Sequence, residues 1–162
     1  MRLPVDELVK NYKDSIFRAA ISVCRNVEDA EDVVQDTYIQ YMNSSRQFES
    51  EEHIKAWLLR TAINKSKNIV TSFWHRNRVD IDEYLEETQF QEPEDRQLVK
   101  AVLSLPKQYR IVVHLYYQED YQVKEIAEIL NIPDGTVKSR LSRGRKILKD
   151  ILKEDSTNDR KR

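Results

Sequence analysis

The chain has very little cysteine, glycine or proline and no long apolar run. Its 162 residues include one cysteine, two glycines and four prolines. The single cysteine, Cys24, excludes an internal disulfide and a cysteine-based metal cluster, and its apolar neighbours favour a packing role over a redox switch. No apolar run approaches the roughly 20 residues of a membrane span, and the segment MRLPVDELVK lacks a signal-peptide pattern. We therefore expect a mostly helical protein of the cytoplasm.

Motifs of catalysis and of cofactor binding are also missing. The three histidines, His53, His75 and His114, are scattered along the chain. The sequence contains no glycine-rich phosphate loop, no Ser-His-Asp set and no spacing typical of metal ligands. It therefore predicts no catalytic residue, no cofactor and no metal site, and a small enzyme is the weakest of the functions considered.

Charged residues are abundant and segregated along the chain, although the net charge is only −1. Residues 28–36 hold five acidic side chains and no basic one, and residues 53–79 hold six Lys or Arg and no acidic one. Residues 80–95 return to eight acidic side chains and no basic one. This last stretch also has a proline and weak apolar periodicity, which predicts a flexible acidic linker with at most one loose turn.

The fold class that these patterns predict is all-α, with two small helical domains. We place the domains at residues 3–79 and 97–153, with the linker at residues 80–96 and a frayed tail from Glu154. Apolar spacing predicts helices over Val5–Cys24, Val27–Met42, His53–Trp74, Gln97–Leu105 and Lys107–Tyr117. Within them we place Val9 and Trp57 on buried sides, Asn26 at a helix cap and Pro106 at a first helical position.

The segment Tyr121–Lys149 predicts a helix-turn-helix. Ile126, Ala127 and Leu130 recur at helical spacing, and residues 131–135 (NIPDG) then interrupt the pattern with residues that favour turns and helix starts. A second apolar stripe follows at steps of four, three and four, made of Val137, Leu141, Gly144 and Leu148.

The second helix of this motif has a cationic outer face. Residues 136–149 contain six Lys or Arg and no acidic residue. Such a face suits the major groove of DNA, where Lys and Arg meet phosphates and guanine edges; the alternative is a solvated face with an accidental run of charge. The candidate DNA-binding residues are Thr136, Lys138, Ser139, Ser142, Arg143 and Lys146.

Two helices of the first domain have contrasting polar faces. In the second helix Asp29, Asp32, Gln35 and Asp36 lie opposite the apolar side, and they either contact a basic partner or are simply solvated, although the acids near Asp29 are partly explained by the helix dipole. In the third helix, amides and cations are interleaved with aromatics, as single-stranded nucleic acid requires. These residues are Arg60, Asn64, Lys67, Asn68, Trp74 and Arg76, and Trp74 is equally compatible with packing.

Three motifs occur in a fixed order over nearly the whole chain: DAEDVVQDTY, AWLLRTAINKSKN and LPKQYRIVVHLYY followed by IAEILNIPDGTVKSRLSRGRKIL. In this order and spacing the sequence resembles the extracytoplasmic-function (ECF) group of bacterial sigma factors. The resemblance implies a specificity factor that binds core RNA polymerase and directs initiation at promoters with −10 and −35 elements, in a stress or envelope response.

The resemblance also implies roles for individual residues. Asp32, Gln35 and Asp36 would dock on the clamp helices of the polymerase β-prime subunit. The third helix and the loop at residues 43–52 would open the −10 element and hold an extruded base. Asn64 stands at the asparagine position of the family, whereas Asn68 replaces an aspartate found in many members.

In the C-terminal domain the resemblance assigns the −35 element to Lys138, Ser139, Ser142 and Arg143. Arg145 and Lys146 would contact phosphates, and the domain would sit on the polymerase β-flap. Members are commonly held inactive by an anti-sigma factor, in many cases membrane-anchored, and we expect a monomer outside such complexes. The main alternative is a free-standing helix-turn-helix regulator, which would need a dimer, but the sequence contains no heptad or apolar seam for one.

Overall fold

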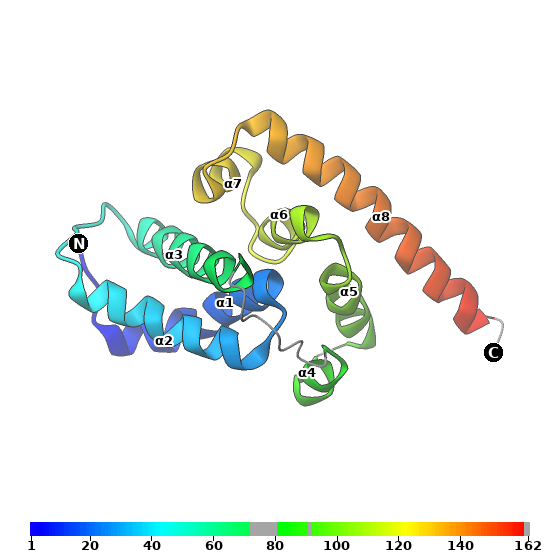
Figure 1. The fold of residues 1–162 in the computed structure, drawn as a ribbon, viewed down its shortest axis with the longest axis horizontal. Helices are drawn as coiled ribbons and strands as arrows, with labels where there is room; N and C mark the ends of the chain where they lie inside the picture. The colour runs from blue at the N-terminus through cyan, green and yellow to red at the C-terminus, as the bar shows by residue number, and fades with distance from the viewer. Residues whose placement is uncertain (72–80, 91, 161–162) are drawn as a thin grey trace. The chain divides into compact units, whose positions relative to one another are not determined.

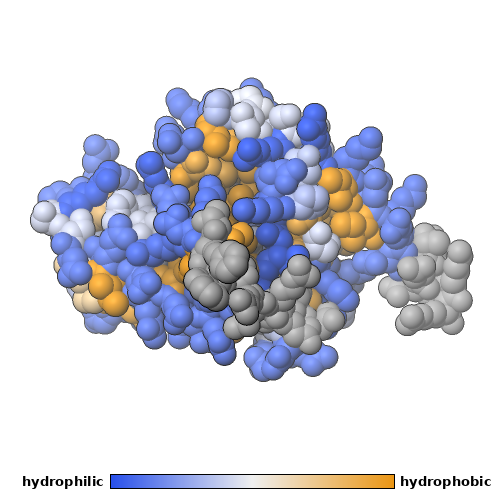
Figure 2. Space-filling model, viewed as in Figure 1, coloured by the Kyte–Doolittle hydropathy of each residue, from blue (hydrophilic) through white to orange (hydrophobic). Residues whose placement is uncertain are grey.

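The computed structural model describes residues 1–71, 81–90 and 92–160, and in these ranges it contains eight helices and no strand. The chain divides into two compact units, Met1–Val79 and Asp80–Arg162, so the all-α class with two helical domains is confirmed. Figure 1 shows the helices of each unit. Hydrophilic residues dominate the face drawn in Figure 2, with smaller hydrophobic areas between them, as expected for helices with one apolar side.

Residues 1–71 of the N-terminal unit form a three-helix bundle in which each helix packs against the other two. Its helices are α1 (Val5–Cys24), α2 (Val27–Asn43) and α3 (Glu51–Thr71). The core is made by apolar side chains at helical spacing on all three, among them Leu8, Ile16, Val33, Ile54, Leu58 and Leu59.

The turn between α1 and α2 is built from two capping residues. Arg25 adopts a left-handed conformation, with φ of 54°, and its N–H donates to the carbonyl of Ile21 at 2.9 Å. The side chain of Asn26 then accepts a hydrogen bond from the N–H of Asp29 at 2.9 Å. The predicted cap at Asn26 is therefore confirmed, since it satisfies one of the free N–H groups at the start of α2.

Some details of the first unit differ from the prediction. Val9 is 39% exposed, because Leu8 occupies the buried side of α1 and its neighbour is turned by about 100° toward solvent. Helix α3 begins two residues before His53, where Ser50 Oγ accepts a hydrogen bond from the N–H of His53 at 3.1 Å. The predicted end of this helix at Trp74 lies outside the described residues.

The described residues of the C-terminal unit form five helices, of which α5, α6, α7 and α8 pack together. The five helices are α4 (Ile81–Glu87), α5 (Pro93–Leu103), α6 (Lys107–Tyr117), α7 (Val123–Leu130) and α8 (Asp134–Arg160). Helix α8 packs against α5, α6 and α7, and α4 packs against α5. The described part of the acidic stretch is thus more helical than predicted: Leu85 of α4 is buried at 1% exposure, and α5 begins at Pro93 rather than at Gln97.

Two prolines mark helix starts in this unit. Pro93 stands in the first turn of α5, where its missing N–H costs nothing. Pro106, which we predicted at the first helical position of α6, is instead the residue before it, with ψ of 145°. Its carbonyl accepts hydrogen bonds from the N–H groups of Tyr109 and Arg110, so it still starts the helix.

Helix α8 is longer than the sequence suggested. We predicted fraying from Glu154, but the helix continues to Arg160. Ile151 and Leu152 are half-buried, so the apolar side of α8 extends for another turn beyond Leu148. No Gly or Pro follows Gly144, so no helix breaker ends α8 earlier.

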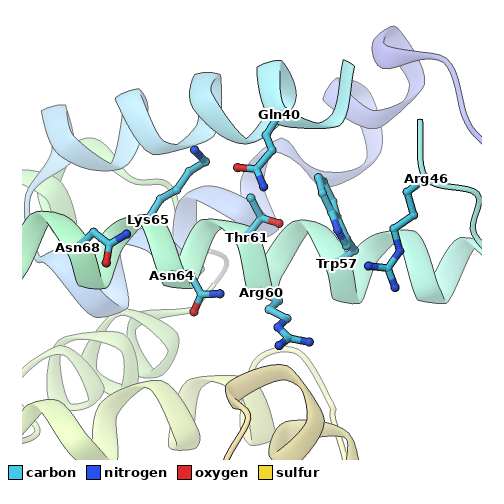
Figure 3. Close-up of a pocket in the computed structure, with 8 residues that line it drawn as sticks. All are labelled: Gln40, Arg46, Trp57, Arg60, Thr61, Asn64, Lys65 and Asn68. Atoms are coloured by element: carbon cyan, nitrogen blue, oxygen red, sulfur yellow. The ribbon is translucent and has the colours of Figure 1, made fainter. Parts of the chain in front are cut away.

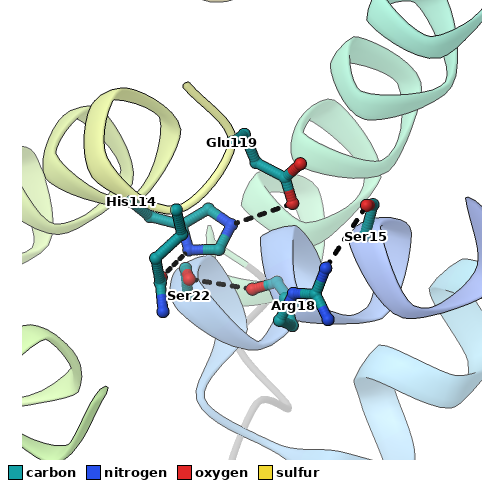
Figure 4. A network of polar contacts seen from close by, with 6 residues as sticks. Ser15, Arg18, Ser22, His114 and Glu119 are labelled. Atoms are coloured by element: carbon teal, nitrogen blue, oxygen red, sulfur yellow. Dashed lines mark hydrogen bonds and ion pairs between the residues drawn. The ribbon is translucent and has the colours of Figure 1, made fainter. Parts of the chain in front are cut away.

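The turn between α6 and α7 is held by polar contacts of its own residues. The N–H groups of Gln118 and Glu119 donate to the carbonyl of His114, and the N–H of Tyr121 donates to Leu115. His114 Nδ1 contacts Gln118 Oε1, and His114 Nε2 lies 3.9 Å from Glu119 Oε1 (Figure 4). These contacts set the direction in which the chain enters α7.

Candidate nucleic-acid interface

Helices α7 and α8 form the predicted helix-turn-helix. A reciprocal capping box starts α7, in which Gln122 and Glu125 each accept a hydrogen bond from the other's N–H. Helix α7 ends at Asn131, whose left-handed φ of 55° is a conformation that asparagine tolerates well. Two residues later Pro133 accepts hydrogen bonds that start α8 at Asp134.

The apolar stripe of α8 packs inward as predicted. Val137, Leu141, Gly144 and Leu148 are all buried. At Gly144 the backbone of α8 approaches α6 so closely that a Cβ atom would stand 2.7 Å from Val113 Cγ2 and 3.3 Å from Tyr109 Cβ. Because this side of α8 faces the domain, its opposite side faces outward.

The outward side of α8 carries the predicted DNA-binding residues. Thr136 is half-buried, and five others are exposed: Lys138, Ser139, Ser142, Arg143 and Lys146. Arg145, which was expected to contact phosphate, places its guanidinium 4.9 Å from the ring centre of Tyr116 and 5.5 Å from that of Tyr117. The Arg145 guanidinium thus makes cation–π contacts with tyrosines of its own domain.

Burial and charge also affect a tyrosine near the start of α7. The pKa of Tyr121 is raised well above its usual value, first by burial and then by the carboxylates of Glu119 and Glu125. Tyr121 is therefore a neutral packing residue at any physiological pH.

A polar cavity lies between α2, α3 and the loop that joins them (Figure 3). Its volume is about 430 Å³. Three of the residues predicted for single-strand binding line it: Arg60, Asn64 and Asn68. Lys67 is half-buried and is not among the lining residues, and Trp74 and Arg76 lie outside the described residues.

Four lining residues were not predicted, and these are Gln40, Trp57, Thr61 and Lys65. The fifth, Arg46, lies in the loop at residues 43–52 that the resemblance assigned to the −10 element. We had placed Trp57 in the core, but it is only half-buried. The fully buried side chains of this part of α3 are Leu58, Leu59, Ala62 and Ile63, so Trp57 stands at the edge of the buried side. The spacing of Trp57, Thr61, Asn64 and Asn68 along one helix face was the available signal.

The acidic face of α2 is open to solvent. Asp32, Gln35 and Asp36 are exposed. The same side continues toward the C-terminal end of α2 with two exposed apolar residues, Ile39 at 48% and Met42 at 54% exposure. Asp29 is half-buried, and its N–H is engaged by the Asn26 cap.

Two classes of site do not occur in the part of the chain that the structure describes. There, no group of three or more His, Cys, Asp or Glu side chains could hold a metal ion. Among the described helices, none combines the length and apolarity of a membrane span.

Comparison with known proteins identifies both units. A family model described as "Sigma-70 region 2" matches residues 8–76, and one described as "Sigma-70, region 4" matches residues 95–148. The chain is 30% identical to the ECF RNA polymerase sigma factor SigW of Bacillus subtilis (strain 168), over 91% of this chain and 88% of that protein. It is 33% identical to the RNA polymerase sigma factor SigV of the same strain, over 91% of this chain and 90% of that protein.

Solved structures share the fold. The sigma factor RpoE of Bartonella quintana, in complex with the anti-sigma factor NepR, aligns with a TM-score of 0.71 and 22% identity over 91% of this chain and 96% of that one. CnrH in complex with the cytosolic domain of CnrY aligns with a TM-score of 0.68 and 24% identity over 93% of this chain and 88% of that one.

Proposed function

The chain belongs to the ECF group of RNA polymerase sigma factors, and we propose that it binds core RNA polymerase and directs initiation at promoters with −10 and −35 elements. The observation that carries the proposal is that each of the two units bears a polar or basic surface whose chemistry suits nucleic acid. One has the exposed basic face of α8, which suits duplex DNA, and the other has the polar cavity beside α3, which suits an unpaired base.

The cavity in the N-terminal unit fits the opening of the −10 element. Extruding a base costs a few kcal/mol of unstacking, which only a specific pocket and further protein contacts offset. The cavity offers the amides of Asn64 and Asn68 for a base edge, the Arg60 guanidinium for phosphate and the half-buried Trp57 ring for stacking. We assign Lys67, Trp74 and Arg76 to the same strand on the sequence alone.

Contacts with core polymerase would supply most of the free energy that keeps the protein bound at a promoter. Asp32, Gln35 and Asp36 on α2 suit a basic partner surface, and Ile39 and Met42 beside them add apolar area to it. We propose the β-prime clamp helices as that partner, with Asp29 at the margin. In the C-terminal unit, a cavity of about 410 Å³ suits the β-flap and is lined mainly by apolar side chains, including Leu98, Val102, Leu148 and Leu152.

Because the two units are tethered, binding of one raises the effective concentration of the other at its own site, and the second contact becomes intramolecular. On this proposal the protein has no enzymatic activity of its own, acts in the cytoplasm where its polymerase is, and is monomeric outside its complexes. Of its solved structural neighbours, RpoE is in complex with the anti-sigma factor NepR, and CnrH is in complex with the cytosolic domain of CnrY. We therefore propose an anti-sigma partner here too, which releases the protein in a stress or envelope response.

The deciding experiment combines the purified protein with core polymerase. We expect transcription from a matching promoter that core polymerase alone does not start, and start-site mapping would then define the two promoter elements. If the protein bound promoter DNA tightly by itself as a dimer and never bound core polymerase, the proposal would be wrong.

The −35 assignment is tested by Arg143→Ala, with Lys146→Ala as the matched control on the same exposed helix face. If Arg143 makes a bidentate contact to guanine, its loss should cost about 1–3 kcal/mol and relax the preference at one base pair. Lys146→Ala should weaken binding evenly across sequences. It should also lower the slope of the logarithm of the binding constant against the logarithm of salt concentration by about one. Holoenzyme binding to a set of single-base promoter variants measures both, and an even loss for Arg143→Ala would make it a phosphate contact.

A further inference from the structure

Arg2 joins two parts of the N-terminal unit that border the cavity. Its Nη2 donates to the carbonyl of Tyr41, in the last turn of α2, at 2.7 Å. Its Nη1 donates to the carbonyl of Arg46, in the following loop, at 2.6 Å. The guanidinium also lies 4.2 Å from the ring centre of Tyr41. The contacts proposed above with polymerase and DNA do not involve Arg2.

The first three residues reinforce the same bridge. The N–H of Phe48 donates to the carbonyl of Met1 at 3.1 Å. The Tyr41 hydroxyl donates to the carbonyl of Leu3 at 2.8 Å and accepts from its N–H at 2.9 Å. In Figure 1 the N-terminus lies beside the connection between α2 and α3, as these bonds require. The N-terminal segment is thus bonded to both the end of α2 and the loop.

The loop that Arg2 holds forms one side of the cavity. Arg46 lines the cavity next to Trp57 (Figure 3). Phe48 is buried at 3% exposure, with its ring centre 5.8 Å from that of Trp57 and 5.8 Å from the Arg46 guanidinium. A displacement of the loop would therefore move both Arg46 and the ring that packs against Trp57.

The chemistry of the bridge favours arginine specifically. The last carbonyls of a helix lack partners within the helix, and cations near this end are favoured by the helix dipole. The planar guanidinium has five N–H donors in a fixed fork and can hold two carbonyls at a set separation, whereas the compact ammonium of lysine cannot reproduce that geometry. Arg2 therefore ties the loop to α2 in a defined position.

We propose that Arg2 is a positioning residue for the −10 cavity, acting through the carbonyl of Arg46. This inference rests on the proposed function, because it takes the cavity to hold an unpaired promoter base. A loop that is already ordered does not have to be fixed when the base enters, so the bridge lowers the entropic cost of capture. Arg2 need not touch DNA to do this.

The test uses holoenzymes made with Arg2→Ala, Arg2→Lys, Arg46→Ala, the Arg2→Ala/Arg46→Ala double variant and Asn64→Ala. Promoter opening is followed by the fluorescence of 2-aminopurine in the −10 element. We expect Arg2→Ala to slow opening about tenfold and Arg2→Lys to recover little of the loss. The Arg46→Ala substitution removes the side chain but keeps the carbonyl that Arg2 bonds and the Phe48 ring. In that background the Arg2 substitution should therefore still slow opening, but by less than in wild type. Affinity for core polymerase should not change.

A second promoter separates positioning from general stability. It is already unpaired in the −10 element and carries an abasic site in place of the captured base. Because this template has no duplex to open, holoenzyme binding to it is measured instead. The Arg2→Ala defect should disappear there, whereas a merely structural defect would persist as weaker binding and overturn the inference.

The remaining outcomes distinguish the two proposals. If Arg46→Ala and Asn64→Ala slow opening while Arg2→Ala does not, or if the Arg2 and Arg46 losses are fully additive, the positioning role is wrong and the cavity assignment stands. If none of these variants slows opening, both the cavity assignment and the positioning role are wrong.

Discussion

The ionisation of Tyr38, on the inward side of α2, is predicted to lower the stability of the protein at high pH. Burial, followed by the nearby carboxylate of Asp14, raises its pKa from 10.0 to about 12. Between these pH values the unfolded chain loses the phenol proton and the folded one keeps it, so the free energy of unfolding falls as the pH rises. The contribution of Tyr38 to the free energy of unfolding is therefore fully present below pH 10 and lost above pH 12. The difference of two pKa units corresponds to about 3 kcal/mol of unfolding free energy.

The measurement is urea unfolding of the wild type and Tyr38→Phe across that pH range. The phenylalanine ring keeps the packing and loses the titrating hydroxyl, together with its 3.3 Å hydrogen bond to the carbonyl of Leu8. We expect the variant to be less stable near neutral pH but to lose less stability on the way to alkaline pH. Parallel curves for the two proteins would contradict the assignment.

Single residues were predictable where their own helix determined their environment. Asn64 and Asn68 came from amide spacing on α3, and the cavity places them together. Gln40 was missed because it comes from a different helix, and periodicity within one helix does not reveal which neighbour lies beside it. Arg46 was covered only by the resemblance, which assigned the whole loop at residues 43–52. Trp57 was misplaced because its apolar ring was taken as core, although it stands at the edge of the buried stripe.

The contact between α6 and α8 depends on Gly144 having no side chain. We expect Gly144→Ala to lower the free energy of unfolding by about 1–3 kcal/mol despite the better helix propensity of alanine. The added Cβ would stand 2.7 Å from Val113 Cγ2, and a valine in a helix has little rotamer freedom to move away.

Gly135→Ala is the matched control in the same helix. Nothing lies within 4 Å of a Cβ at Gly135, so this change should be neutral or should stabilise by about 0.4–1 kcal/mol. Urea unfolding of both variants measures the difference. Equal midpoints for the two would show that α8 can move away from α6 at little cost.

Helices were predicted well where apolar spacing and caps agreed, and less well where a segment was judged by charge. Helices α1 and α6 have the predicted bounds, and α2 is one residue longer. The acidic stretch was predicted to be a linker, but Leu85 is buried and packs α4 into the unit. The acidic residues after Pro93 lie in the first turn of α5, where the helix dipole favours negative charge. The continuation of α8 was missed because its polar end resembles a tail in composition.

The assembly with polymerase is tested by reversing charge on α2. Replacing Asp32 and Asp36 with lysine should weaken binding to core polymerase by at least about tenfold, because close like charges across an interface cost several kcal/mol. Both residues are exposed, so the free energy of unfolding should stay within about 0.5 kcal/mol of wild type. Equilibrium binding to labelled core polymerase provides the measurement.

The matched control reverses the exposed Glu86 and Glu87 of α4, with the same change in net charge. Equal losses for the two pairs would show that overall charge, rather than the α2 face, governs binding. The sequence leaves open whether the acidic stretch follows a basic channel of the polymerase or is only a solubilising spacer. A loss of binding for the α4 pair would favour the channel, and no loss would favour the spacer.

For the molecule as a whole, segregation of charge was more informative than its sum. A net charge of −1 gives no hint of nucleic acid, but the alternating acidic and basic blocks predicted two helical domains, and the chain does divide into two units. Which residues meet the polymerase or the anti-sigma factor depends on surfaces outside this chain, so periodicity and composition could not establish it.

The length of α8 has a mechanical consequence. Its 27 residues form one unbroken helix, about 40 Å long at 1.5 Å per residue. No proline interrupts it between Arg143 and Ile151, so a rotation of its C-terminal end is passed along the helix. A protein bound to that end would therefore also turn the outward side chains that we propose to contact the −35 element.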